Sequence, residues 1–164
     1  MKKIVIGALA ALAMTGIGIW QLGGSTNAAP SVAFTTLQND AFTTENLRGK
    51  VVLVKFWATS CVTCVAQMPD AIQNYNDLSS KGFDIIAVAM DYDPPDYVKN
   101  FAESRKLPFK VVMDSNGAIA RAFGDVKLTP TAFLIDKNGN IIKRYLGNYD
   151  KQDFLNTVNK ALAS

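Results

Sequence analysis

Runs of apolar residues separated by polar turns predict the elements of this chain. Short runs rich in β-branched and aromatic residues are typical of strands, and they occur at 32–37, 42–44, 51–57, 83–90, 109–113, 131–135 and 141–146. Apolar residues spaced three and four apart are typical of helices, and they occur at 61–79, after Asp93, at 116–123 and after Asp150. Strands alternate with helices and the last two strands flank a turn. The pattern therefore predicts an α/β fold, with a mixed central sheet flanked by helices.

Two aspartates and two prolines are expected at helix boundaries. Asp93 and Asp150 are expected to cap the helices that follow them, because a carboxylate accepts hydrogen bonds from unpaired N–H groups of the first turn. Pro94 would then stand in the first turn of its helix. Pro69 lies inside the helical pattern at 61–79, so this helix should be kinked or restarted there.

The only two cysteines lie where the strand at 51–57 meets the next helix, in Cys61-Val62-Thr63-Cys64. Free N–H groups and the helix dipole at a helix start favour a thiolate, which is the reactive form of cysteine. The spacing predicts thiol–disulfide exchange, in which Cys61 forms a mixed disulfide with a partner and Cys64 resolves it. The alternatives are a buried inert pair and half of a metal site.

Composition narrows the chemistry mainly by what the chain lacks. The sequence of 164 residues has no histidine, which removes the usual general base, the Cys–His hydrolases and most zinc or copper sites. Without Lys2 and Lys3 the 17 basic residues become 15, against 14 acidic ones, and this balance gives no indication of nucleic acid. We expect no metal site and no cofactor other than the redox-active disulfide.

The N-terminal residues are typical of a membrane-targeting segment. Residues 4–22 carry no charge, and this length matches the roughly 17–25 residues of a spanning helix, so a signal anchor is favoured over a cleaved signal peptide. The lysines before this run should place the N-terminus in the cytoplasm and the domain at the periplasmic face of the inner membrane. If the segment is cleaved, the protein would be soluble in the periplasm. Residues 23–30 are predicted to be a flexible linker, and residues 31–164 the folded domain.

Two stretches carry a family resemblance. Val54–Cys64, followed by Met68-Pro69, resembles the active-site block of thioredoxin-like proteins, and its tail is similar to the membrane-anchored TlpA/ResA group of thiol–disulfide oxidoreductases. Residues 128–136 with Gly139 resemble the family's second signature, a loop that carries a cis-proline. The resemblance covers residues 31–164 and implies a thioredoxin fold with an extra N-terminal β-hairpin.

The resemblance also implies site residues beyond the cysteines. Pro130 is expected to be cis and to lie against the cysteine pair, with neighbouring backbone available for strand-like contact with a substrate. Thr129, Pro130, Trp57 and Ser60 are the expected substrate contacts. For Trp57 the alternative is a place in the core, since its strand neighbours are apolar.

The sequence departs from the family at four places. Ser60 stands where many relatives have tryptophan, and Val62-Thr63 replaces a pair that usually contains proline. Gln67 stands where some relatives have an acidic residue that manages protons, and Lys55 takes the place of a buried acid. Lys55 and Gln67 are therefore candidates for tuning the pKa of the thiols, Lys55 by its charge or as a neutral amine that relays protons. The alternative is that its stem packs while the ammonium reaches solvent or an acid.

The group resemblance implies a membrane-tethered protein-disulfide reductase. Such an enzyme would take electrons from a membrane donor and reduce disulfides of extracytoplasmic proteins, including proteins of cytochrome c maturation. An oxidase of the same fold that introduces disulfides is the main alternative, because direction depends on reduction potentials. From other classes, the alternatives are a two-thiolate Cu(I) metallochaperone and a binding module with a structural disulfide.

Overall fold

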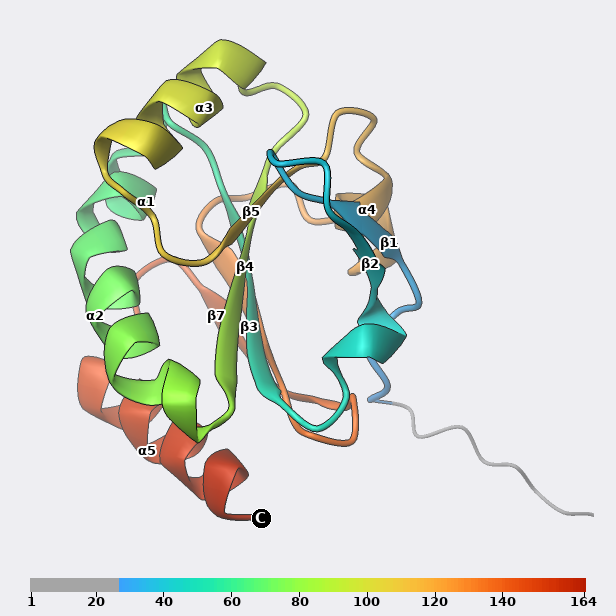
Figure 1. The fold of residues 1–164 in the computed structure, drawn as a ribbon, viewed down its shortest axis with the longest axis vertical. Helices are drawn as coiled ribbons and strands as arrows, with labels where there is room; N and C mark the ends of the chain where they lie inside the picture. The colour runs from blue at the N-terminus through green and yellow to red at the C-terminus, as the bar shows by residue number, and fades with distance from the viewer. Residues whose placement is uncertain (1–26) are drawn as a thin grey trace, which may run out of the picture.

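The computed structural model describes residues 27–164, in which one mixed five-stranded sheet carries the fold (Figure 1). In chain order the elements are β1 (Ala33–Thr35), β2 (Ala41–Thr43), η1 (Thr44–Leu47), β3 (Val51–Trp57), α1 (Val62–Ala66), α2 (Met68–Leu78), η2 (Ser79–Lys81), β4 (Phe83–Ala89), α3 (Pro95–Ser104), β5 (Lys110–Met113), α4 (Ala118–Ala122), β6 (Thr131–Ile135), β7 (Ile141–Leu146) and α5 (Lys151–Ala163). The strand order is β5-β4-β3-β6-β7. β3 pairs in parallel with β4 and antiparallel with β6, so the predicted mixed sheet is confirmed.

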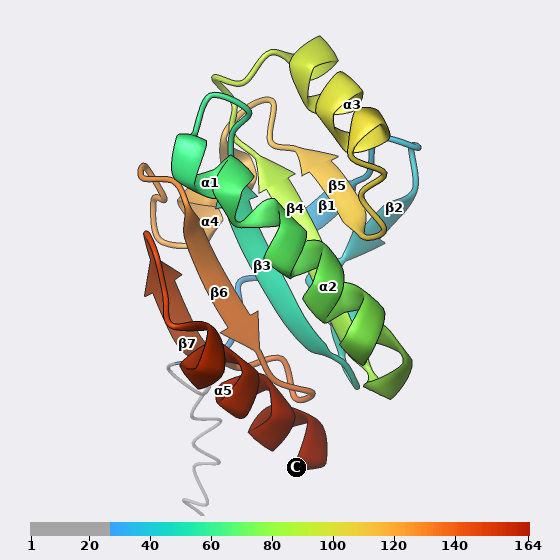
Figure 2. The ribbon, with the colours of Figure 1, turned by 90° about the vertical axis from the view of Figure 1, so that its left-hand side faces the viewer.

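β3 lies at the centre of the sheet and every one of its residues is buried. Its side chains alternate between the two faces, as the period of a strand requires. Val51, Leu53 and Trp57 enter one core cluster, which α2 and α5 cover, whereas Val52, Val54 and Phe56 enter the other. Figure 2 shows α1, α2, α3 and α5 on the near face of the sheet, with α4, β1 and β2 behind it.

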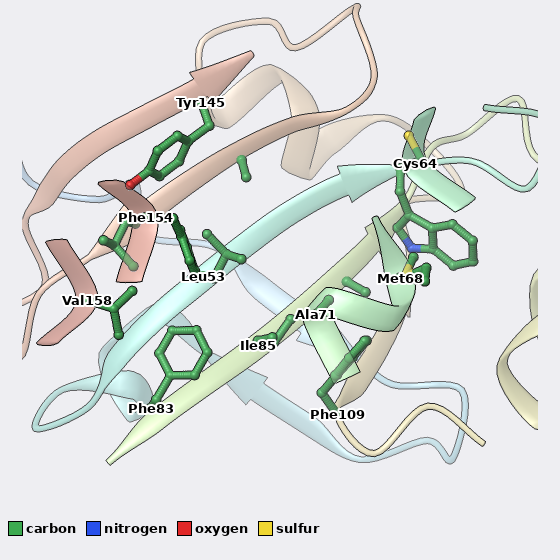
Figure 3. Close-up of a cluster of buried hydrophobic side chains, with 14 of the residues drawn as sticks. Leu53, Cys64, Met68, Ala71, Phe83, Ile85, Phe109, Tyr145, Phe154 and Val158 are labelled. Carbon is green, nitrogen blue, oxygen red and sulfur yellow. The ribbon is translucent and has the colours of Figure 1, made fainter. Parts of the chain in front are cut away.

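The near-face cluster extends from the cysteines to the far end of the molecule. Figure 3 shows Cys64 and Met68 at one end of this cluster, and Phe83 and Val158 at the other. Burial of this apolar surface is the main favourable term for folding, at about 25 cal/mol per Å². The cysteine pair is therefore anchored on a packed layer through Cys64.

The N-terminal β-hairpin implied by the resemblance is present as a separate two-stranded antiparallel sheet of β1 and β2. The predicted restart at Pro69 is also confirmed, since α1 ends at Ala66 and α2 begins at Met68, with Pro69 in its first turn. A proline is tolerated there because its missing N–H would have no partner in a first turn anyway. Asp150 caps α5 and accepts a hydrogen bond from the N–H of Asp153 at 2.7 Å, as predicted.

Part of the predicted linker is bound to the sheet instead. The N–H of Ala29 donates to the carbonyl of Gly139 at 2.9 Å, and the N–H of Ile141 donates to the carbonyl of Asn27 at 2.7 Å. Residues 27–30, which the sequence placed in the linker, thus include residues that pair with the chain at 139–141. Within residues 27–164 no helix has the length and apolarity needed to cross a bilayer. The predicted anchor at 1–22 lies outside the described residues.

Candidate active site

The two cysteines form a disulfide at the start of α1, directly after β3. Cys61 is the N-cap residue, and its sulfur accepts a hydrogen bond from the N–H of Cys64 at 3.2 Å. Cys61 is partly exposed, whereas Cys64 has no exposed surface and packs in the near-face cluster. A donor directed at the Cys61 sulfur favours its thiolate when the bond is reduced. The pair is thus asymmetric, with one sulfur open to a partner and the other enclosed.

The loop between β3 and Cys61 is held by Asp93, a residue for which the sequence predicted another role. Asp93 does not cap α3, whose N-cap is Pro94. Its buried carboxylate instead accepts hydrogen bonds from the N–H and the hydroxyl of Thr59, both at 2.6 Å. These are charge-assisted hydrogen bonds between residues 34 apart in sequence. The sequence pattern around Asp93 or around Thr59 could therefore not reveal them. The prediction of an Asp93 cap is wrong, and Asp93 orients the residues that lead into Cys61.

A second loop carries the predicted proline. The peptide bond between Thr129 and Pro130 is cis, as the resemblance implied. The hydroxyl of Thr129 lies 3.2 Å from that of Tyr92, and the carbonyl of Pro130 accepts a hydrogen bond from the N–H of Gly147 at 2.8 Å. Pro130 itself is buried and Thr129 is partly exposed. Tyr92 and Gly147 are site neighbours that sequence reasoning missed, because only the folded chain brings them to this loop.

The remaining expected substrate contacts differ in accessibility. Ser60 is exposed next to Cys61. Trp57 has no exposed surface, and its ring lies 5.1 Å from that of Phe101 in the core. The expectation that Trp57 contacts a substrate is therefore not supported, and the alternative of a core residue holds in this disulfide form.

Lys55 and Gln67 contact each other, and Gln67 lies at the junction of α1, which carries the cysteines, and α2. Lys55 is 1% exposed, and its Nζ donates a hydrogen bond to Oε1 of Gln67. Burial lowers the pKa of Lys55 from 10.5 to about 8, because desolvation disfavours the charged form. The alternative in which the ammonium reaches solvent or an acid is not observed. Within residues 27–164 no group of three or more cysteine, aspartate or glutamate side chains is arranged to hold a metal ion.

Comparison with known proteins places this geometry in a family. The Redoxin family profile matches residues 24–162. The thiol-disulfide oxidoreductase ResA of Bacillus thuringiensis is 37% identical over 125 residues, which cover 76% of this chain and 70% of that protein. The ResA of Geobacillus thermodenitrificans is 36% identical over 130 residues, covering 79% and 72%.

A solved structure agrees with these relatives. The thiol:disulfide interchange protein of the thioredoxin family from Chlorobium tepidum superposes with a TM-score of 0.75 at 31% identity, covering 83% of this chain and 96% of that one. The fold, the Cys61–Cys64 disulfide and these relatives agree on one chemistry. This chain therefore belongs to the Redoxin family and is a protein thiol–disulfide oxidoreductase.

Proposed function

We propose that this oxidoreductase is a reductase of disulfides in extracytoplasmic proteins, with Cys61 as the attacking thiol and Cys64 as the resolving thiol. The observation that carries the assignment is the asymmetry of the pair. Cys61 is partly exposed, whereas Cys64, with its sulfur, has no exposed surface. Attack requires a sulfur that a partner can reach, so only Cys61 can open a partner's disulfide.

The thiol–disulfide exchange proceeds in two steps. The Cys61 thiolate attacks one sulfur of the partner's disulfide, which forms a mixed disulfide and releases the other sulfur as a thiolate. Cys64 loses its proton to solvent and attacks the Cys61 sulfur, which forms the Cys61–Cys64 disulfide and releases the partner's second thiolate. The two thiolates take up protons from solvent, and a dithiol donor later returns two electrons to the enzyme.

The surface near Cys61 fits a protein partner. Val62, inside the Cys-x-x-Cys motif, is 83% exposed, and Leu128, directly before Thr129, is 64% exposed. Tyr92 is 55% exposed and its hydroxyl lies beside that of Thr129. Exposed large apolar side chains at a reactive group are typical of protein-binding surfaces. A small thiol would not need this apolar area.

The direction and the location rest on the sequence. The resemblance to the TlpA/ResA group favours reduction, with electrons from a membrane donor and with cytochrome c maturation among the pathways served. The apolar run at 4–22 favours a tether that holds the domain at the outer face of the cytoplasmic membrane. A measured reduction potential of about −270 mV would support a reductase, and one of about −120 mV would identify an oxidase.

The assignment of the two thiols is tested by trapping. Cys64→Ser should accumulate the mixed disulfide on Cys61 in cells, and mass spectrometry of the trapped complex identifies the partner. The matched variant Cys61→Ser should trap little, because its remaining sulfur is buried. Equal trapping by both variants would reverse the assignment, and no covalent partner with either would refute the proposed function.

A further inference from the structure

Lys55 lies in the middle of the central strand, on the face that carries the cysteines. It shares this face of β3 with Leu53 and Trp57, which belong to the same cluster as Cys64. Its neighbours across the sheet are Ala87 on β4 and Ala132 on β6. Two alanines beside a lysine leave room for its long side chain above the sheet. The Lys55 side chain is therefore buried above the sheet and does not extend to the surface.

The ammonium has no acidic partner. No carboxylate lies within 4 Å of Lys55 Nζ in the part of the chain that the structure describes, and its hydrogen bond goes to the neutral Oε1 of Gln67. The ring of Tyr149 lies 5.9 Å away, at the limit of a cation–π contact. Among residues 27–164 Lys55 is the only buried basic side chain. A buried cation without a counter-charge is unfavourable unless another state of the protein supplies one.

Gln67 connects this lysine with both sides of the active site. Its N–H donates to the carbonyl of Cys64 at 3.2 Å, at the junction of α1 and α2. Its Nε2 donates to the carbonyl of Gly147 at 3.2 Å, and the N–H of Gly147 donates to the carbonyl of Pro130. The hydrogen bonds thus run from Lys55 through Gln67 to the helix of the cysteines and to the Pro130 loop.

We propose that Lys55 is a positioning residue for the exchange, whose ammonium is the counter-charge of the thiolate formed when the Cys61–Cys64 bond opens, and that Gln67 holds it behind the cysteines. The inference rests on the proposed function only for the roles of the two thiols. A dithiol donor supplies two electrons and two protons to the disulfide. One proton stays on Cys64, the other goes to solvent, and Cys61 remains a thiolate. No histidine exists in the chain to supply this positive charge.

The charge of Lys55 should then depend on the redox state. In the disulfide form burial lowers its pKa to about 8. A thiolate nearby favours the ammonium, so the pKa of Lys55 should be higher in the reduced protein. Oxidation should then release part of a proton from Lys55 in addition to the proton of Cys64. A surface cleft of about 240 Å³ is lined by Gln67 and Tyr149, the two residues that the Lys55 ammonium contacts.

The other titratable groups near this cleft do not provide a free charge for Lys55. Asp70 of α2 and Lys151 of α5 pair with each other at 2.6 Å. Burial raises the pKa of the Tyr149 hydroxyl to about 12, so this group stays neutral at physiological pH. The hydroxyl of Tyr145 on β7 also has a raised pKa, again mainly from burial. The groups that change charge during the reaction are the thiols of Cys61 and Cys64, and Gln67 links Lys55 to the backbone of Cys64.

The test is a titration of the reduced protein, followed by the ultraviolet absorbance of the thiolate. Lys55→Met keeps the length of the side chain and removes the charge, so the pKa of Cys61 should rise by about one unit or more. The reduction potential should become more negative, because the reduced state loses its thiolate stabilisation. The matched control is Lys50→Met, which removes a half-exposed lysine paired with Asp84, and it should leave the thiol titration unchanged.

A second variant separates charge from packing. Gln67→Glu keeps Lys55 and gives it a carboxylate partner, so the thiolate loses its counter-charge and the pKa of Cys61 should again rise. An unchanged Cys61 pKa in Lys55→Met overturns the proposal, and if that variant does not fold, an unchanged pKa in Gln67→Glu overturns it. The titration needs no partner protein. Failure to trap a partner with Cys64→Ser would therefore refute the proposed function without affecting this result.

Discussion

Replacing Lys55 by methionine should change how the stability of the oxidised protein depends on pH. Methionine is unbranched and of similar length, so it fills the space between Ala87 and Ala132 without a charge. With the disulfide intact in both the folded and the unfolded states, the cysteines do not titrate. The comparison of wild type with Lys55→Met therefore isolates the burial of one ammonium.

The magnitude follows from the lowered pKa of Lys55. This group has a pKa of 10.5 in the unfolded chain and about 8 in the folded protein. At about 1.4 kcal/mol per unit, the difference corresponds to roughly 3 kcal/mol. Between these two values the unfolded chain binds more protons, so the free energy of unfolding of the wild type rises with pH. The destabilisation is fully present below pH 8 and is lost as the pH rises towards 10.5.

The assay is urea unfolding of both proteins from about pH 7 to about pH 10, with the disulfide kept oxidised. Over this range the stability of the wild type relative to Lys55→Met should rise by roughly 2.5 kcal/mol, since titration is not complete at pH 10. Contributions from other lysines and tyrosines are common to both proteins and cancel. Parallel curves would show that the Lys55 amine has an ordinary pKa and would refute the reasoning.

Three further changes test other parts of the site and the core. Asp93→Ala leaves the N–H and hydroxyl of Thr59 without their partners, so urea unfolding should show a loss of about 2–4 kcal/mol; a loss below about 0.5 kcal/mol would mean that this carboxylate does not hold the loop. Leu128→Ser alters an exposed side chain, so stability should change by less than about 0.5 kcal/mol while KM for a protein disulfide rises; an unchanged KM would exclude Leu128 from the partner surface. Phe154→Ala opens a cavity where α5 packs on the sheet and should cost about 3–5 kcal/mol, measured by urea unfolding of the oxidised protein; a loss under about 1 kcal/mol would contradict the packing in Figure 3.

Local patterns were sufficient for most of the fold. The strand at 51–57, the break at Pro69 and the cap at Asp150 each depend on interactions within a few residues, and the structure agrees with each. Element boundaries differ from the prediction, since the strand predicted at 32–37 is β1, Ala33–Thr35. The pairing of Asn27 with Ile141 depends on contact across the chain, so the predicted linker boundary was misplaced.

The candidate site shows the same division. The spacing of Cys61 and Cys64 indicated the chemistry, and the disulfide is formed. The sequence pattern predicts Asp93 as the cap of the nearest helix, whereas its carboxylate accepts hydrogen bonds from Thr59, which follows the neighbouring strand. A carboxylate accepts hydrogen bonds from N–H groups both when it caps the next helix and when it contacts a loop distant in sequence. The sequence pattern could therefore not distinguish the two roles. Trp57 was ambiguous for a similar reason, because apolar and aromatic side chains serve both cores and surfaces.

The sequence by itself determined the alternation of the strands, the chemistry of the two thiols and the presence of an unusual lysine in the central strand. These properties depend on residue identity and on periods of two and 3.6 residues, both of which can be read along the chain. Only the tertiary structure decided which cysteine is exposed, which residue donates hydrogen bonds to Asp93 and which residues surround Lys55. Each of these depends on contacts between distant segments: Lys55 on β3 lies beside Ala132 on β6, and its hydrogen bond goes to Gln67 between two helices. Burial and counter-charge, which set the reactivity of the thiols, arise from such contacts.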